Sequence, residues 1–147
     1  SALANWDTSN VTDLSMIFNL NSSLATLNGL ENWNTSKITD LTAAFANEGS
    51  LVDASAIANW NTSNVTNMSA LFRGSKTEYL DLSKWDFSNI TTASSVINNN
   101  KSVVYLGDNA TITADNLNKL GLSNFASFNQ PIILASGNLY TLLSNKN

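Results

Sequence analysis

Apolar and polar positions recur along this chain with a period that four tryptophans mark. Each tryptophan is followed by Asp or Asn, by Thr in three of the four cases, and then by Ser, with Val or Ile two residues later. Successive tryptophans are 27, 27 and 25 residues apart. A fixed period of this length is typical of stacked-repeat proteins. The four residues are Trp6, Trp33, Trp60 and Trp85.

The residues before each tryptophan predict a short strand. Residues 79–82 alternate with period two, which directs Leu80 and Leu82 toward the core and Tyr79 and Asp81 to the outer face. The inward position before each tryptophan is occupied by Leu3, Leu30, Ile57 and Leu82.

Residues 103–106 repeat this alternation and predict a fifth strand that no tryptophan follows. In register, Val104 takes the place of Leu80, and Tyr105 takes the place of Asp81.

The residues after each tryptophan predict an Asx-type turn and then a short helix capped by a Thr. Val11, Leu14 and Phe18 have the i, i+3, i+7 spacing of one helix face, and the following repeats keep this spacing. The turn residues are Asp7, Asn34, Asn61 and Asp86; the helical segments lie within residues 11–18, 38–45, 65–72 and 90–97; the capping residues are Thr12, Thr39, Thr66 and Thr91.

The last forty residues depart from the period and predict a cap over the exposed apolar end of the repeats. A helix is expected from Thr113, its N-cap, to Gly121. Residues 131–135 predict a strand with proline at its start, and residues 139–143 suit a strand or a helix. We therefore expect one domain, with four repeats and a fifth strand in residues 1–107 and a capping region in residues 108–147. A separate small module at the C-terminus is the alternative.

The net charge and the residue types that the chain lacks exclude several classes of function. With a net charge of −4 and a pI of about 4.4, the chain lacks the basic surface of a nucleic-acid binder. No apolar run approaches the roughly 20 residues of a membrane span. The absence of histidine and cysteine, of Ser/His or Cys/His pairs and of phosphate-binding glycine loops argues against an enzyme. We expect no cofactor and no metal.

The pattern W-[DN]-T-S-[NK]-[VI]-T, preceded by a Leu-x-Leu strand, resembles the BspA-type leucine-rich repeats of bacterial surface proteins, over residues 1–106. Its cysteine-free style is similar to lactobacillus-type adhesins. The resemblance implies an α/β solenoid, a leucine-rich-repeat-like right-handed coil with one short parallel strand and one short helix per 25–27-residue repeat. It also implies an extracellular location, at the bacterial cell surface or cell wall.

The aromatic residues have two interpretations. Regular exposed tryptophans could stack on sugar rings, but a buried ladder of corner-filling side chains is the favoured interpretation. The Asp/Asn row could bind calcium, although turn formation accounts for it better because the carboxylates are one to a layer. The expected structural core is Trp6, Trp33, Trp60, Trp85, Phe18, Phe45 and Phe72.

The function predicted is non-catalytic adhesion. The outer face of the sheet would present a ligand-binding set to a host glycoprotein, mucin or extracellular matrix. A structural stalk that displays another module is the alternative, and self-association is a third, weaker possibility. The chain is expected to be a monomeric piece of a larger protein. The ligand-binding set is Tyr79, Asp81, Val103 and Tyr105.

Overall fold

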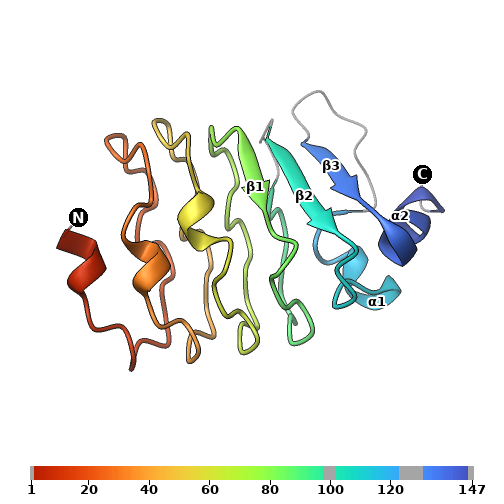
Figure 1. The fold of residues 1–147 in the computed structure, drawn as a ribbon, viewed down its shortest axis with the longest axis horizontal. Coiled ribbons are helices and arrows are strands. Elements are labelled where there is room, and N and C mark those ends of the chain that lie inside the picture. The colour runs from red at the N-terminus through yellow and green to blue at the C-terminus, as the bar shows by residue number, and fades with distance from the viewer. Residues whose placement is uncertain (1, 98–101, 123–130, 146–147) are drawn as a thin grey trace.

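The structure is a computed structural model, and it describes residues 2–97, 102–122 and 131–145. Successive segments of the chain lie side by side in sequence order, from the N-terminus at one end to the helix α2 at the other (Figure 1). The elements are the 3₁₀ turns η1 (Ala2–Asn5), η2 (Leu30–Asn32) and η3 (Ser55–Ile57), the strands β1 (Tyr79–Asp81), β2 (Val103–Gly107) and β3 (Ile132–Ala135), and the helices α1 (Ala114–Leu117) and α2 (Gly137–Ser144).

The strands form one parallel sheet in the order β1-β2-β3. Leu80 pairs with Val104 and Asp81 with Tyr105, so the predicted register between these two strands is confirmed. The third strand, expected at residues 131–135, is also confirmed and pairs with β2 through Tyr105 and Leu134. Strand β2 pairs with β1 on one side and with β3 on the other, so the sheet joins the predicted repeat region to the predicted capping region. The boundary between these two regions at residue 107 stays a prediction.

The predicted fold class is wrong. The described residues form a small domain with a three-stranded parallel sheet and two α-helices, not an α/β solenoid or a leucine-rich-repeat-like right-handed coil. Where strands were expected before the first three tryptophans, the chain forms η1, η2 and η3. None of the four segments expected to be helical contains an α-helix.

Left-handed backbone conformations explain why those helices do not form. Met16, Ala43, Ala70 and Ser95 occupy equivalent positions and have φ values of 58°, 52°, 57° and 59°. A right-handed helix requires φ near −63°, so none can pass through these residues. Their backbone bonds run sideways instead: the amide of Met16 donates to the carbonyl of Thr42 at 2.8 Å.

The threonines that were expected to cap helices bond to neighbouring segments. The amide of Thr39 donates to the carbonyl of Thr12 at 2.8 Å, and the amide of Thr66 donates to the carbonyl of Thr39 at 2.9 Å. Thr91 continues the series by donating to Thr66 at 2.8 Å. Isolated parallel bridges join the next residues in the same way, Asp13 with Asp40, Asp40 with Asn67, and Asn67 with Thr92.

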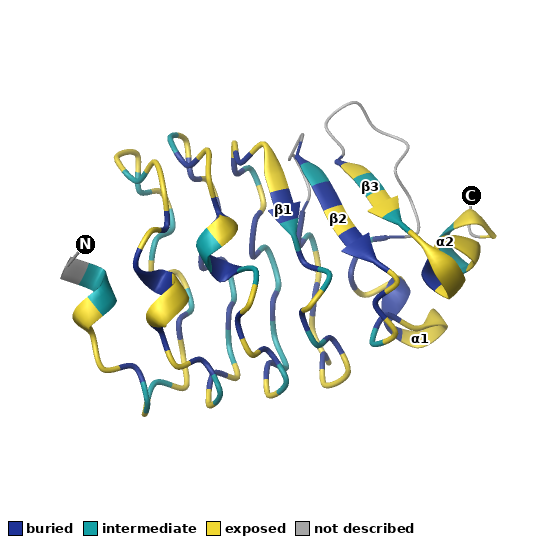
Figure 2. Cartoon of the chain, in the orientation of Figure 1, coloured by how far each residue is buried: buried dark blue, intermediate teal, exposed yellow. Residues whose placement is uncertain are grey.

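The core runs along the inside of these segments, as the dark ribbon in Figure 2 shows. Phe45 and Phe72 are fully buried, and Phe18 is half-buried. The ring centroids of Phe18 and Phe45, and those of Phe45 and Phe72, are 5.8 Å apart in stacked arrangements. Burial of one ring on the next supplies apolar contact that no single segment could provide.

The C-terminal elements follow the sequence more closely. Thr113 caps α1 as predicted, because its hydroxyl accepts the amide of Asn116 while the Asn116 side chain accepts the amide of Thr113. The helix ends at Leu117, earlier than expected, and a left-handed Gly121 with φ of 75° lies four residues further on. Residues 139–143, which suit a strand or a helix by sequence, belong to α2.

Candidate functional site

The side chains that face outward from the sheet form the candidate site. Parallel pairing aligns them in two rows across the three strands, with Tyr79, Val103 and Ile132 in one and Asp81, Tyr105 and Leu134 in the other. Between them, Leu80 and Val104 point into the core. We call these six residues the outer sheet face; its exposed positions are the light bands on β1, β2 and β3 in Figure 2.

The structure brings together all four residues of the predicted ligand-binding set. Tyr79 is 49% exposed and Tyr105 is 37% exposed, while Asp81 and Val103 are half-buried. The pKa of Tyr79 is raised by partial burial first, and then by the charges of Asp81 and Tyr105. Asp81 and Tyr105 therefore lie close enough to Tyr79 to oppose ionisation of its phenol.

Asp81 has one oxygen engaged and one available. Its Oδ1 accepts the amide of Ser83 at 3.0 Å and the Ser83 hydroxyl at 2.7 Å. These two bonds hold the carboxylate in place at the end of β1. Oδ2 takes part in none of the described hydrogen bonds, so it can accept a bond from a ligand.

The ring of Tyr105 lies with its tip against the backbone at the end of β2. A Cβ at Gly107 would be 3.3 Å from the Tyr105 hydroxyl oxygen and 3.4 Å from the Ser83 Cβ. Gly107 also has φ of 57°, a conformation that favours glycine. This position therefore lets the ring lie along the strand.

Two apolar residues of the site were missed from the sequence. Ile132 is 60% exposed and Leu134 is 45% exposed, and both extend the outer sheet face onto β3. The strand itself was predicted from the apolar run 131–135, but an unbroken run does not show which side chains face the core. Pairing with β2 supplies that information.

Three of the four tryptophans are buried, in contrast to the tyrosines of the outer sheet face. Trp33, Trp60 and Trp85 are no more than 5% exposed, and the indole N–H of Trp60 donates to the Leu30 carbonyl at 2.9 Å. The indole of Trp33 stacks on that of Trp60 with centroids 6.2 Å apart. Trp6 differs, with 55% exposure and one neighbouring indole, Trp33, at 5.9 Å.

A row of buried threonines joins neighbouring segments, and sequence reasoning gave these residues no role. The Thr35 hydroxyl donates to the Asn61 carbonyl at 3.0 Å and accepts the Asn61 amide at 3.0 Å. Thr8 bonds to Asn34 and Thr62 bonds to Asp86 in the same way. The sequence did contain a signal for this role. Thr recurs directly after the Asp or Asn of the turn in three repeats, although an Asx turn does not require Thr at that position.

The Asp/Asn row forms the predicted turns. The side-chain oxygens of Asp7, Asn34, Asn61 and Asp86 each accept the amide of the serine two residues ahead. The Ser9 hydroxyl and amide lower the pKa of Asp7. Among the described residues, no three His, Cys, Asp or Glu side chains come together as a metal site would require.

Glu48 is a buried carboxyl outside these rows. It is 0% exposed, and neither carboxyl oxygen has a hydrogen-bond partner. Burial raises its pKa to about 7, and the opposing effect of the Asn21 backbone is smaller.

Replacing Glu48 by glutamine is expected to stabilise the protein at pH 8 and to have little effect near pH 4.5. The folded protein favours the neutral carboxyl, so this group's stabilising contribution is fully present below pH 4.5 and is lost as the pH rises through about 7. We expect about 1–3 kcal/mol between these limits, after allowance for solvent screening. Urea denaturation across this pH range measures it.

The same change at the exposed Glu78 is the matched control and should leave the pH dependence of stability unchanged. The chain has no histidine to titrate within this range. If E48Q and the wild type lose stability in parallel from pH 5 to pH 8, Glu48 is not the titrating group.

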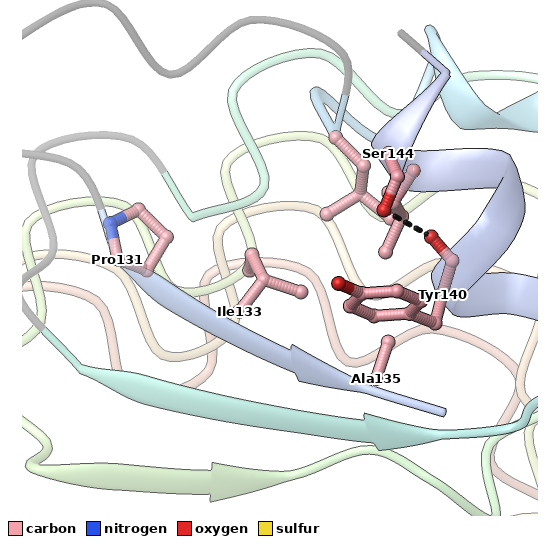
Figure 3. Close-up of a pocket in the computed structure, with 7 residues that line it drawn as sticks. Pro131, Ile133, Ala135, Tyr140 and Ser144 are labelled. Carbon is pink, nitrogen blue, oxygen red and sulfur yellow. Dashed lines mark hydrogen bonds between the residues drawn. The ribbon is translucent and has the colours of Figure 1, made fainter. Parts of the chain in front are cut away.

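A hollow lies between β3 and α2, on the inner side of the sheet (Figure 3). Ile133, Ala135 and Tyr140 line it, and the Ser144 hydroxyl donates to the Tyr140 carbonyl at 2.8 Å. Its lining contains no charged side chain. It therefore offers apolar packing and little that could orient a polar ligand.

A protein family described as "Mycoplasma protein of unknown function, DUF285" has a model that matches this chain twice, over residues 1–109 and 23–132. That family is associated with BspA-like surface repeat proteins. No curated protein and no solved structure matches the chain. None of the described helices is long and apolar enough to cross a membrane.

Proposed function

This chain belongs to the DUF285 family, and on that premise we propose that it is a non-catalytic adhesion domain of the BspA-like type. It would act outside the cell, at the bacterial cell surface or cell wall. Its ligand would be a host or extracellular glycoprotein, such as a mucin or a matrix protein. The outer sheet face would bind that ligand.

The observation that carries this proposal is the exposure of two tyrosines on a rigid sheet. Tyrosine presents a large contact area at low conformational cost, which is why binding surfaces are enriched in it. Tyr79 and Tyr105 lie on adjacent strands with Asp81 beside them, and the strand backbones fix their relative positions. The face is also weakly charged, as the chain's 12% content of charged residues favours.

Replacing Tyr79 and Tyr105 together by serine is expected to reduce binding to a mucin-coated surface at least roughly tenfold, because both anchoring rings are lost. Surface plasmon resonance with the purified chain measures the effect. Tyr140→Ser is the matched control, since Tyr140 is 61% exposed and lies on α2. It should bind as the wild type does.

Two other outcomes decide against the proposal. If the double variant binds as well as the wild type, the outer sheet face is not the binding surface. If the folded wild type binds neither mucin nor a matrix protein, this chain acts as a spacer that displays another module.

A further inference from the structure

We infer that the outer sheet face recognises neutral, N-acetylated sugar rings on the glycoprotein. This inference rests on the proposed function and adds the chemical class that the surface takes. It goes beyond a general protein contact because size, charge and the arrangement of side chains each restrict the ligand.

The extent of the face matches a short oligosaccharide. Three strands at about 4.8 Å spacing and two rows about 6.6 Å apart place its six residues on a grid of about 10 Å by 7 Å. Sugar rings linked in a short chain can cover a grid of this size.

The aromatic groups suit the apolar face of a pyranose. Sugar C–H groups carry partial positive charge, and the face of an aromatic ring is negative, so the two attract when stacked. Tyr105 lies with its tip against Gly107 and remains 37% exposed, which leaves ring surface accessible from outside. Tyr79 is one strand away and provides a second stacking position.

Polar and apolar neighbours then select among sugars. Asp81 Oδ2 can accept a bond from a sugar hydroxyl or an acetamido N–H next to the stacked ring, and an ionised acceptor strengthens such bonds. Val103 and Leu134 are the strand neighbours of Tyr79 and Tyr105, where they can contact the methyl group of an acetamido substituent.

Charge excludes the acidic sugars. Asp81 is the one ionisable carboxylate on this face, and the whole chain has a net charge of −4. No lysine or arginine belongs to the face to offset them. Sialic acids and sulfated glycans would therefore be repelled, whereas neutral N-acetylhexosamines would not.

Titration of the isotope-labelled chain with an N-acetylglucosamine trisaccharide tests the inference by amide chemical shifts. Shifts should concentrate in 79–81, 103–107 and 132–135, and sialyllactose should cause much smaller ones. Tyr105→Ser should weaken binding roughly three- to tenfold, while Tyr105→Phe keeps the ring and most of the affinity. Tyr140→Ser should titrate as the wild type does.

The inference is overturned if the trisaccharide leaves these strands unshifted, or if folded Tyr105→Ser binds it as tightly as the wild type. A second measurement separates this failure from failure of the proposed function. If enzymatically deglycosylated mucin still binds, and binding still needs Tyr79 and Tyr105, the adhesion function stands and the sugar specificity is wrong. If the trisaccharide, both forms of mucin and a matrix protein all fail to bind, both are wrong.

Discussion

Replacing Trp60 by alanine is expected to lower the free energy of unfolding by about 3–5 kcal/mol, the range for loss of a buried large aromatic side chain. Trp60 is 4% exposed and stacks on Trp33 at 6.2 Å. It also packs on Phe45, with ring centroids 5.9 Å apart. Its removal leaves a cavity and takes away one of two hydrogen bonds to the Leu30 carbonyl, which accepts the Trp60 indole N–H at 2.9 Å and the Trp33 amide at 3.1 Å.

Trp6→Ala is the matched control. Trp6 is 55% exposed and stacks on one indole, so we expect a loss of about 1 kcal/mol or less. Urea denaturation followed by circular dichroism measures both variants. If W60A is too unstable to fold, Trp60→Phe keeps a ring and should give an intermediate loss. Equal losses for W6A and W60A would contradict the assignment of Trp60 to the core.

Replacing Thr35 by valine is the second change with a large expected effect. Valine has a similar shape, but it can neither donate to the Asn61 carbonyl nor accept the Asn61 amide, which Thr35 now bonds at 3.0 Å each. Two backbone groups are left unsatisfied beside a side chain that is 4% exposed. We expect a loss of about 2–4 kcal/mol in the free energy of unfolding.

Thr39→Val makes the same chemical change at an exposed position. The Thr39 hydroxyl donates to the Thr12 carbonyl at 3.3 Å, and water can replace it there. The expected loss is below about 0.5 kcal/mol. A T35V variant that is as stable as T39V would show that the buried threonine row does not join the segments.

Strands β1 and β2 could be predicted because their side chains alternate between the core and the outer face, and the sequence shows this alternation. Residues 79–82 place a leucine at every second position, and the parallel register with 103–106 follows from matching those leucines to Val104 and Leu106. The same logic identified Tyr79 and Tyr105 as outward. It could not orient Ile132 and Leu134, because the run 131–135 is apolar at every position.

The helices were wrongly predicted because the i, i+3, i+7 spacing of apolar residues does not determine the backbone conformation between them. Leu41 and Phe45 are buried as a helix face would require, yet Ala43 between them has φ of 52°. The turns that contain such residues also bring side chains three and four positions apart to one side. Alanine and methionine carry no sequence signal for a left-handed conformation, which glycine or asparagine would have given.

The hydrogen bonds to neighbouring segments explain why that conformation persists. Left-handed φ costs a non-glycine residue roughly 1–2 kcal/mol. At Ala43 the cost is offset by an amide that donates to the Ser69 carbonyl at 2.9 Å and by burial of the side chain. Periodicity within one segment contains no information about bonds to the next.

The arrangement separates the roles of the aromatic residues. Trp33, Trp60 and Trp85 bury their rings and donate their indole N–H groups to backbone carbonyls, which fixes neighbouring segments relative to one another. Tyr79 and Tyr105 lie on the sheet that these segments support, with their rings accessible. Residues that recur in every repeat therefore maintain the structure, and those that differ between repeats form the candidate site.

Hydrogen–deuterium exchange of the chain with and without bound mucin tests the central claim most directly. The outer sheet face predicts slower exchange on binding in peptides that cover 79–81, 103–107 and 132–135, with the Asx turns near Asn34 and Asn61 unchanged. Protection confined to those turns, or spread evenly over the chain, would contradict the assignment of binding to the outer sheet face.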